Sequence, residues 1–131
     1  MNDSSIIAVD MASPVPVYEQ IVQQIQQGVT GGRLAPGAPL PTVRQLATDL
    51  VLNRNTVARA YKLLEDQGVI QTAGRKGTFI RTGAVDEVSR LKQGQAERAI
   101  RETIQSLVRN GLSYDEISRL FTSALAMEGK G

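Results

Sequence analysis

The 131-residue chain contains no cysteine and no histidine. Disulfides, thiol nucleophiles, imidazole bases and the usual zinc sites are therefore excluded. No apolar run approaches the roughly 20 residues that a helix needs to cross a bilayer, and the opening MNDSSIIAVDM lacks the basic start and the apolar middle of a secretory signal. We expect a cytoplasmic protein that is not an enzyme, with no membrane partner, no cofactor and no bound metal.

The chain also lacks an even spread of charge. Residues 50–81 carry a net charge of +4, whereas residues 1–49 carry −2 and residues 82–131 carry zero. A basic block of this kind favours an anionic partner, with nucleic acid as the first candidate. A merely solvated basic face is the alternative, and charge alone does not separate the two.

Apolar spacing predicts the elements of the first two-thirds of the chain. After a flexible N-terminus over residues 1–13, helices are expected over about 17–30, 43–50 and 53–67, with Thr42 and Gln45 forming a capping box. The segment LAPGAPLP between the first two helices is too rich in proline for a helix and reads as a tight connector. Two β-prone pieces, 69–72 and 78–81, flank a basic tip and predict a hairpin. Two helices joined by a turn of about three residues and followed by a hairpin make a winged helix-turn-helix, which we assign to residues 14–81.

The remaining residues, 82–131, predict a two-helix tail. A long helix begins near Val85 and ends at Asn110-Gly111, and Gly94 lies inside it. Ser113 and Glu116 form a second capping box at the start of the last helix. The expected fold is thus mainly α with a small β-hairpin wing.

The stretch NRNT, residues 53–56, has two interpretations. Asn53 and Thr56 are ordinary residues for a helix start, but Arg54 is not, because the positive end of a helix prefers Asp or Glu by roughly 0.3–1 kcal/mol. No acid occurs in this helix before Glu65. The arrangement becomes favourable if a phosphate is delivered to that end. Arg and Asn also match the base edges of guanine and adenine.

These residues resemble the DNA-binding domain of GntR-type bacterial transcription regulators. The resemblance covers about 65 residues and rests on PVYEQI, GRLAPGAPLPTVRQLA, NRNTVARAYKLLEDQG and GTFI. It implies a sequence-specific regulator, most simply a repressor on a palindromic operator. The short tail is similar to that of the YtrA-like subfamily, which implies a homodimer and control of a transporter operon. No effector is identified.

Three positions depart from the family pattern. Ala58 stands where the family often has Arg, and Arg59 lies one position later, about 100° around the helix. Val51 replaces the usual Gly of the turn, and since a β-branched residue is strained at positive φ, we expect this turn to be built differently. In the wing, GRKGTF displaces the first Gly of the family motif to position 74.

The candidate site residues form two sets. The expected DNA-binding residues are Thr42, Arg44, Asn53, Arg54, Asn55, Thr56, Arg59, Arg75, Lys76 and Gly77. The expected dimerisation residues are Leu91, Ala99, Ile100, Ile104, Leu107, Val108, Ile117, Leu120, Phe121 and Leu125. Two alternatives remain open: the tail packs on its own winged domain, or the winged helix is a protein-interaction module that does not bind specific DNA.

Overall fold

The computed structural model describes residues 7–129 and divides the chain into two compact units, Met1–Leu91 and Lys92–Gly131. The division falls within helix α4 (Ala84–Arg109). We expected it at residues 81–82, but Ala84 and Val88 at the start of α4 are buried in the core of the first unit. The first unit therefore includes two turns of α4 that the apolar pattern alone would give to the tail.

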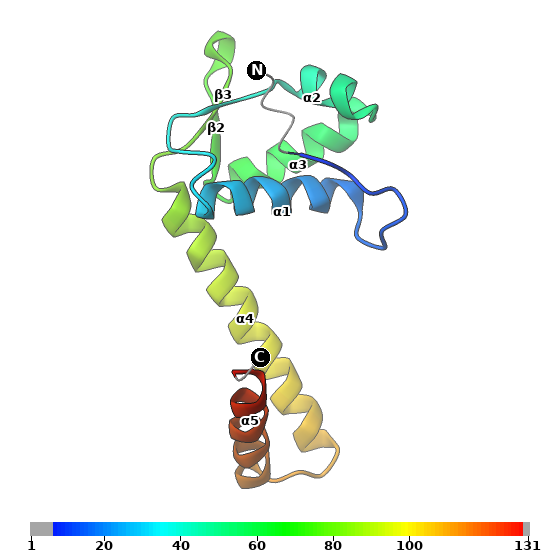
Figure 1. The fold of residues 1–131 in the computed structure, drawn as a ribbon, viewed down its shortest axis with the longest axis vertical. Coiled ribbons are helices and arrows are strands. Elements are labelled where there is room, and N and C mark those ends of the chain that lie inside the picture. The colour runs from blue at the N-terminus through cyan, green and yellow to red at the C-terminus, as the bar shows by residue number, and fades with distance from the viewer. Residues whose placement is uncertain (1–6, 130–131) are drawn as a thin grey trace. The chain divides into compact units, whose positions relative to one another are not determined.

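The first unit contains three further helices and a small sheet (Figure 1). The helices are α1 (Val17–Thr30), α2 (Val43–Leu50) and α3 (Arg54–Asp66). The strands are β1 (Pro39–Leu40), β2 (Ile70–Thr72) and β3 (Thr78–Ile80), and a short 3-10 helix, η2 (Gly74–Lys76), forms the tip between β2 and β3. The predicted helices, hairpin and helix-turn-helix are thus confirmed, and the first unit is a winged helix.

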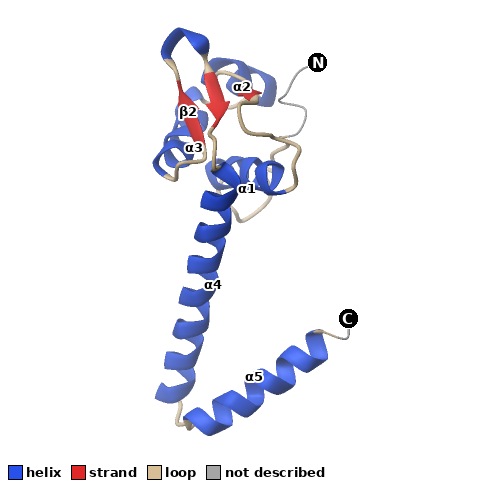
Figure 2. Cartoon of the chain, turned by 90° about the vertical axis from the view of Figure 1, so that its left-hand side faces the viewer, coloured by secondary structure: helices blue, strands red, loops and turns tan. Residues whose placement is uncertain are grey.

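The sheet has three antiparallel strands in the order β1-β3-β2, drawn in red in Figure 2. Leu40 lies opposite Thr78, and Ile70 lies opposite Ile80. The connector predicted between the first two helices contains a strand that the sequence pattern did not predict, because Pro39 and Leu40 pair with β3 at the edge of the hairpin. Proline is tolerated there since an edge strand leaves some of its N–H groups without a ladder partner.

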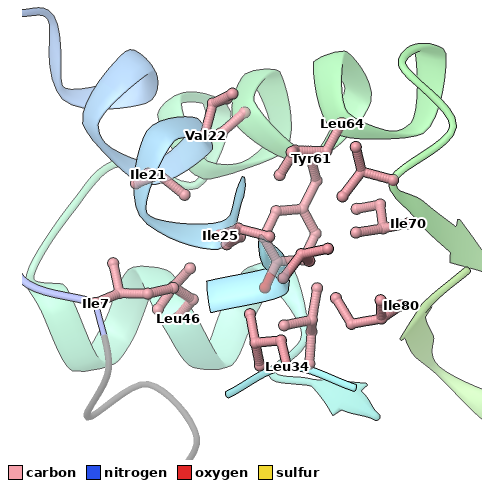
Figure 3. Packing of buried hydrophobic residues seen from close by; sticks show 14 of the residues in the cluster. Ile7, Ile21, Val22, Ile25, Leu34, Leu46, Tyr61, Leu64, Ile70 and Ile80 are labelled. Carbon is pink, nitrogen blue, oxygen red and sulfur yellow. The ribbon is translucent and has the colours of Figure 1, made fainter. Parts of the chain in front are cut away.

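One hydrophobic core lies among the helices and the sheet of the first unit (Figure 3). Its largest fully buried side chains come from every layer: Ile21, Ile25, Val29, Leu46, Val57, Leu64, Val69, Ile70, Ile80 and Val88. The Tyr61 ring lies among them, and its hydroxyl donates a 2.6 Å hydrogen bond to the Pro41 carbonyl. This bond joins α3 to the residues that begin α2. Burial raises the pKa of the Tyr61 phenol above its ordinary value of 10.

The segment before α1 is anchored, which corrects the expectation of a flexible N-terminus for residues 7–10. Ile7 is 3% exposed and belongs to the core cluster. The Asp10 N–H donates to the Gln20 side chain at 2.8 Å, and Gln20 donates back to the Asp10 carbonyl at 3.0 Å. Residues 1–6 lie outside the described residues.

The second unit comprises the rest of α4 and helix α5 (Tyr114–Glu128). Helix α4 continues through Gly94 without interruption. The predicted capping box at α5 is confirmed: Ser113 Oγ accepts from the Glu116 N–H at 3.1 Å, and Glu116 Oε1 accepts from the Ser113 N–H at 3.0 Å. Hydrogen bonding of the Glu116 carboxyl to the Ser113 N–H and to the Ser113 hydroxyl lowers the pKa of that carboxyl.

Candidate nucleic-acid interface

The first turn of α3 presents an uncompensated positive end. Asn53 is the N-cap, and its Oδ1 accepts a 2.7 Å hydrogen bond from the Asn55 N–H. The first turn holds no acidic residue, and Arg54 is exposed. The N-terminal N–H groups and the guanidinium together favour an anion at this end. Capping and recognition are compatible here, since the Asn53 amide nitrogen and the Asn55 side chain are not used by the cap bond.

The turn before α3 has the left-handed geometry for which the family uses glycine. Val51 adopts φ 55 and ψ 52, so the expectation of a differently built turn is wrong. The residue is 89% exposed, so no packing of its side chain offsets the strain. The turn is held from both sides by backbone bonds, from the Val51 N–H to the Thr48 carbonyl at 3.3 Å and from the Leu52 N–H to the Ala47 carbonyl at 2.8 Å.

Helix α2 contributes Arg44 in its first turn. The predicted capping box is confirmed: Thr42 Oγ1 accepts from the Gln45 N–H at 3.1 Å, and Gln45 Oε1 accepts from the Thr42 N–H at 2.9 Å. Thr42 therefore has a local role that needs no ligand. Arg44 is exposed beside this helix start.

The wing tip adds two cations. Arg75 and Lys76 lie on η2 and are exposed. Gly74 at φ 56 and Gly77 at φ 100 provide the reversals that close the tip. Among the residues that the structure describes, neither Arg75 nor Lys76 forms a salt bridge, and the same holds for Arg44 and Arg54. Four guanidinium or ammonium groups of the winged helix are thus left without an acidic partner.

The second and third turns of α3 differ from the first. The Arg59 guanidinium carbon lies 3.8 Å from the centroid of the Tyr18 ring on α1, which is a close cation–π stack. The Lys62 ammonium donates a 3.0 Å hydrogen bond to the Asp66 carboxylate, and this bond raises the pKa of Lys62. Tyr18, Arg59, Lys62, Leu63 and Asp66 line a shallow pocket of about 250 Å³. Sequence reasoning placed Arg59 among the DNA contacts and missed its stacking partner, because Tyr18 is 41 positions away in the chain.

The expected dimerisation residues of the second unit vary in accessibility. Ala99, Ile100, Val108, Leu120 and Leu125 are exposed, whereas Leu91 (the last residue of the first unit), Ile104, Leu107 and Phe121 are half-buried. Ile117 is 3% exposed, so it supports α5 from inside and has almost no surface left for a partner. Between α4 and α5 lies an apolar groove of about 160 Å³, lined by Thr103, Leu107, Leu120, Phe121 and Ala124.

Metal sites and membrane-spanning helices are the other classes of site to consider in the described part of the chain. Residues 7–129 contain no group of three or more acidic side chains placed to hold a metal ion. Within the same residues, no helix combines the length and the hydropathy that crossing a membrane requires.

Comparison with known proteins gives a consistent family. The family described as bacterial regulatory proteins, gntR family, matches residues 17–80, from the start of α1 to the end of β3. The HTH-type transcriptional repressor YtrA of Bacillus subtilis is 38% identical over 99 residues, which covers 76% of each chain.

Solved structures agree with this assignment. A transcriptional regulator from Oenococcus oeni superposes with a TM-score of 0.70 at 35% identity, covering 90% of this chain and 98% of that chain. The DNA-binding domain of AraR, solved in complex with operator ORX1, gives a TM-score of 0.51 at 25% identity over 56% of this chain and 95% of that chain. These relatives are transcription regulators rather than enzymes. The chain belongs to the GntR family of bacterial transcription regulators, is similar to its YtrA-type members, and carries a DNA-binding winged helix.

Proposed function

We propose that the chain is a repressor that binds a palindromic operator as a homodimer. The observation that carries this proposal is the first turn of α3, where an exposed arginine occupies the positive helix end and no acid compensates it. In a helix-turn-helix, the N-terminal residues of the second helix meet the base edges of the major groove. Arg54 and Asn55 are the two side chains we assign to base contacts.

The other exposed cations would position the winged helix on the DNA backbone. Arg44 begins α2, and Arg75 and Lys76 form the wing tip. We assign them to phosphate or neighbouring-groove contacts, together with the backbone at Gly77. Such contacts supply affinity without sequence information, and they release counterions from DNA. Affinity should therefore fall steeply and linearly on a log–log plot against salt.

Repression and the wider role rest on relatives. The B. subtilis relative is named a repressor, and a bound dimer would repress wherever its operator overlaps the polymerase site. Control of a transporter operon, the finest part of the proposal, is supported by the YtrA resemblance alone. A regulator of this kind acts in the cytoplasm, where bacterial DNA lies.

The dimer proposal rests on the second unit. A groove lined by apolar side chains, together with exposed Ile100, Leu120 and Leu125, is surface that water solvates poorly. A second copy of the chain offers the same apolar surface, and a two-fold pairing would bury that surface on both copies at once. It would also present two recognition helices to two half-sites.

Substitution of Arg54 tests operator recognition. Genomic fragments selected with the purified protein would define the operator, and mobility shift would then compare wild type, Arg54→Ala and Arg98→Ala. Arg98 is an exposed cation on α4 and serves as the matched control for lost charge. We expect Arg54→Ala to weaken operator binding by about 1–3 kcal/mol and Arg98→Ala to bind like wild type. Equal binding by Arg54→Ala and wild type would remove the recognition assignment.

A separate experiment tests self-association and the two alternatives. Leu120→Asp places a charge on the apolar groove, and Ser118→Asp places one on an exposed position of the same helix as a control. Light scattering should report a monomer for Leu120→Asp and a dimer for Ser118→Asp. A wild-type monomer would favour packing of the tail on its own winged unit. A dimer without salt-sensitive DNA binding would favour the protein-interaction module.

A further inference from the structure

Ala58 occupies a position on α3 that none of the contacts above explains. It follows Arg54 by four residues, so the two side chains lie on one face of the helix, one turn apart. Both are exposed. The core-facing positions of α3 are Val57, Ala60, Tyr61 and Leu64, and Ala58 lies off that face, since its side chain is exposed. The surface that carries Arg54 therefore continues at Ala58 with a bare methyl group.

Two polar side chains that follow Ala58 on α3 are committed elsewhere. The Arg59 guanidinium is stacked on Tyr18, and the Lys62 ammonium is paired with Asp66. Glu65 lies on the Ala58 face two turns further on, where a carboxylate disfavours the approach of phosphate. Beyond Arg54 and Asn55, the part of this surface that can approach a base therefore ends with the methyl group of Ala58.

We infer that Ala58 is a specificity-determining residue that contacts the 5-methyl group of a thymine in each half-site of the operator. The inference rests on the proposed operator binding. Thymine is the one base with a methyl group in the major groove, and alanine is among the side chains that contact it. Alanine has no donor or acceptor beyond its backbone, so the polar edges of guanine or cytosine at that position would lose water without gaining a partner.

Replacement of thymidine by 2′-deoxyuridine tests this contact, because it removes only the methyl group. The full-length protein is titrated with the selected operator, and each thymidine of the half-site is replaced in turn, symmetrically in both halves. We expect one position at which the loss of the methyl weakens binding by about fourfold per half-site, the value for one buried carbon group.

The variant Ala58→Gly links that position to this side chain. It should bind the thymidine and deoxyuridine duplexes equally, whereas Ala96→Gly, an exposed alanine-to-glycine change inside α4, should keep the wild-type ratio. Thermal melting checks that Ala58→Gly is folded. The quantity compared is the ratio of the affinities for the thymidine and deoxyuridine duplexes, measured for each variant separately. A general loss of affinity by Ala58→Gly therefore does not affect the result.

Two outcomes overturn the inference. In the first, wild type binds every deoxyuridine duplex as tightly as the unmodified operator. In the second, Ala58→Gly keeps the wild-type sensitivity at each position. Either result leaves the proposed function intact if Arg54→Ala still loses operator binding. If selection returns no preferred sequence and Arg54→Ala binds DNA like wild type, the proposed function fails and the inference fails with it.

Discussion

The two units of this chain use apolar residues in opposite ways. In the first unit, helices, strands and the segment before α1 close around a core, and eighteen hydrophobic residues of the described chain belong to it. In the second unit, Ile117 is the one described residue in the buried class, and large apolar side chains of α5 reach 73–74% exposure. The first unit closes around its own core, whereas the second leaves large apolar side chains at its surface.

The charges follow the same division. The cations of the winged helix that we assign to DNA have no acidic partner among the described residues, and they lie at helix starts and at the wing tip. The second unit carries six basic and five acidic residues, and we assign none of them to DNA. The proposed DNA contacts thus lie in the first unit and the proposed pairing surface lies in the second, so the proposal predicts that DNA reading and pairing are separable.

The largest expected effect contrasts a core leucine with a tail leucine. Leu64→Ala removes a fully buried side chain of α3, and it should lower the free energy of unfolding of the first unit by about 2–5 kcal/mol through lost burial and a cavity. Leu125→Ala removes a side chain that is 73% exposed, and it should cost under about 0.5 kcal/mol at protein concentrations low enough to keep the chain monomeric. Urea unfolding followed by circular dichroism measures both. Equal losses would mean that α5 is packed as tightly as the core.

A smaller effect, of opposite sign, is expected at the helix-turn-helix turn. Val51→Gly relieves a β-branched residue at φ 55. The gain of about 1–2 kcal/mol from leaving a strained left-handed conformation is partly offset by the greater entropy of glycine in the unfolded chain, about 0.5–1 kcal/mol. A net stabilisation of about 0.5–1 kcal/mol should appear as a higher melting temperature of the first unit. A lower melting temperature would show that the valine side chain stabilises the turn in a way its exposure does not reveal.

The smallest expected effect is a loss of helix content in acid at the start of α5, in the second unit. The Glu116 carboxyl has a lowered pKa in the folded chain, so its contribution to stability is present above its ordinary value of 4.5 and is lost as pH falls through the folded pKa. The start of α5 should therefore fray in mild acid. Glu116→Gln keeps the capping geometry without the titrating group, and it should reduce the pH dependence of helix content between pH 6 and pH 3. Identical acid profiles for the two proteins would contradict the assignment.

Local patterns predicted most of the fold. Helix stripes, two capping boxes and the β-prone pieces around the basic tip were each confirmed, because these features depend on residues within a few positions of one another. The errors concern partners that are distant in sequence. Strand β1 forms because β3 lies beside Pro39 and Leu40. Residues 7–10 are held in place because Asp10 hydrogen-bonds to Gln20 and Ile7 packs in the core.

The candidate site was predictable to the same extent. Asn53, Arg54 and Arg44 follow from helix starts that the sequence marks by itself. The stack of Arg59 on Tyr18 depends on how α1 crosses α3, which spacing along one helix does not reveal. The turn at Val51 shows the opposite error: an unfavourable residue was expected to change the backbone, yet the flanking helices hold the left-handed geometry in spite of it.

The central claim is that the first unit binds an operator half-site and that the second unit pairs two copies of the chain, and one measurement tests it most directly. Fluorescence anisotropy would measure the binding of the full-length chain, and of a chain ending at Leu91, to a palindromic operator and to a single half-site. Ending at Leu91 keeps Ala84 and Val88 in the core of the first unit. The full-length chain should bind the palindrome about 100-fold or more tighter than the half-site, because pairing makes the second contact intramolecular. The shorter chain should bind each half-site independently and with equal affinity. A preference for the palindrome that survives in the shorter chain, or one that is absent from the full-length chain, would contradict the account.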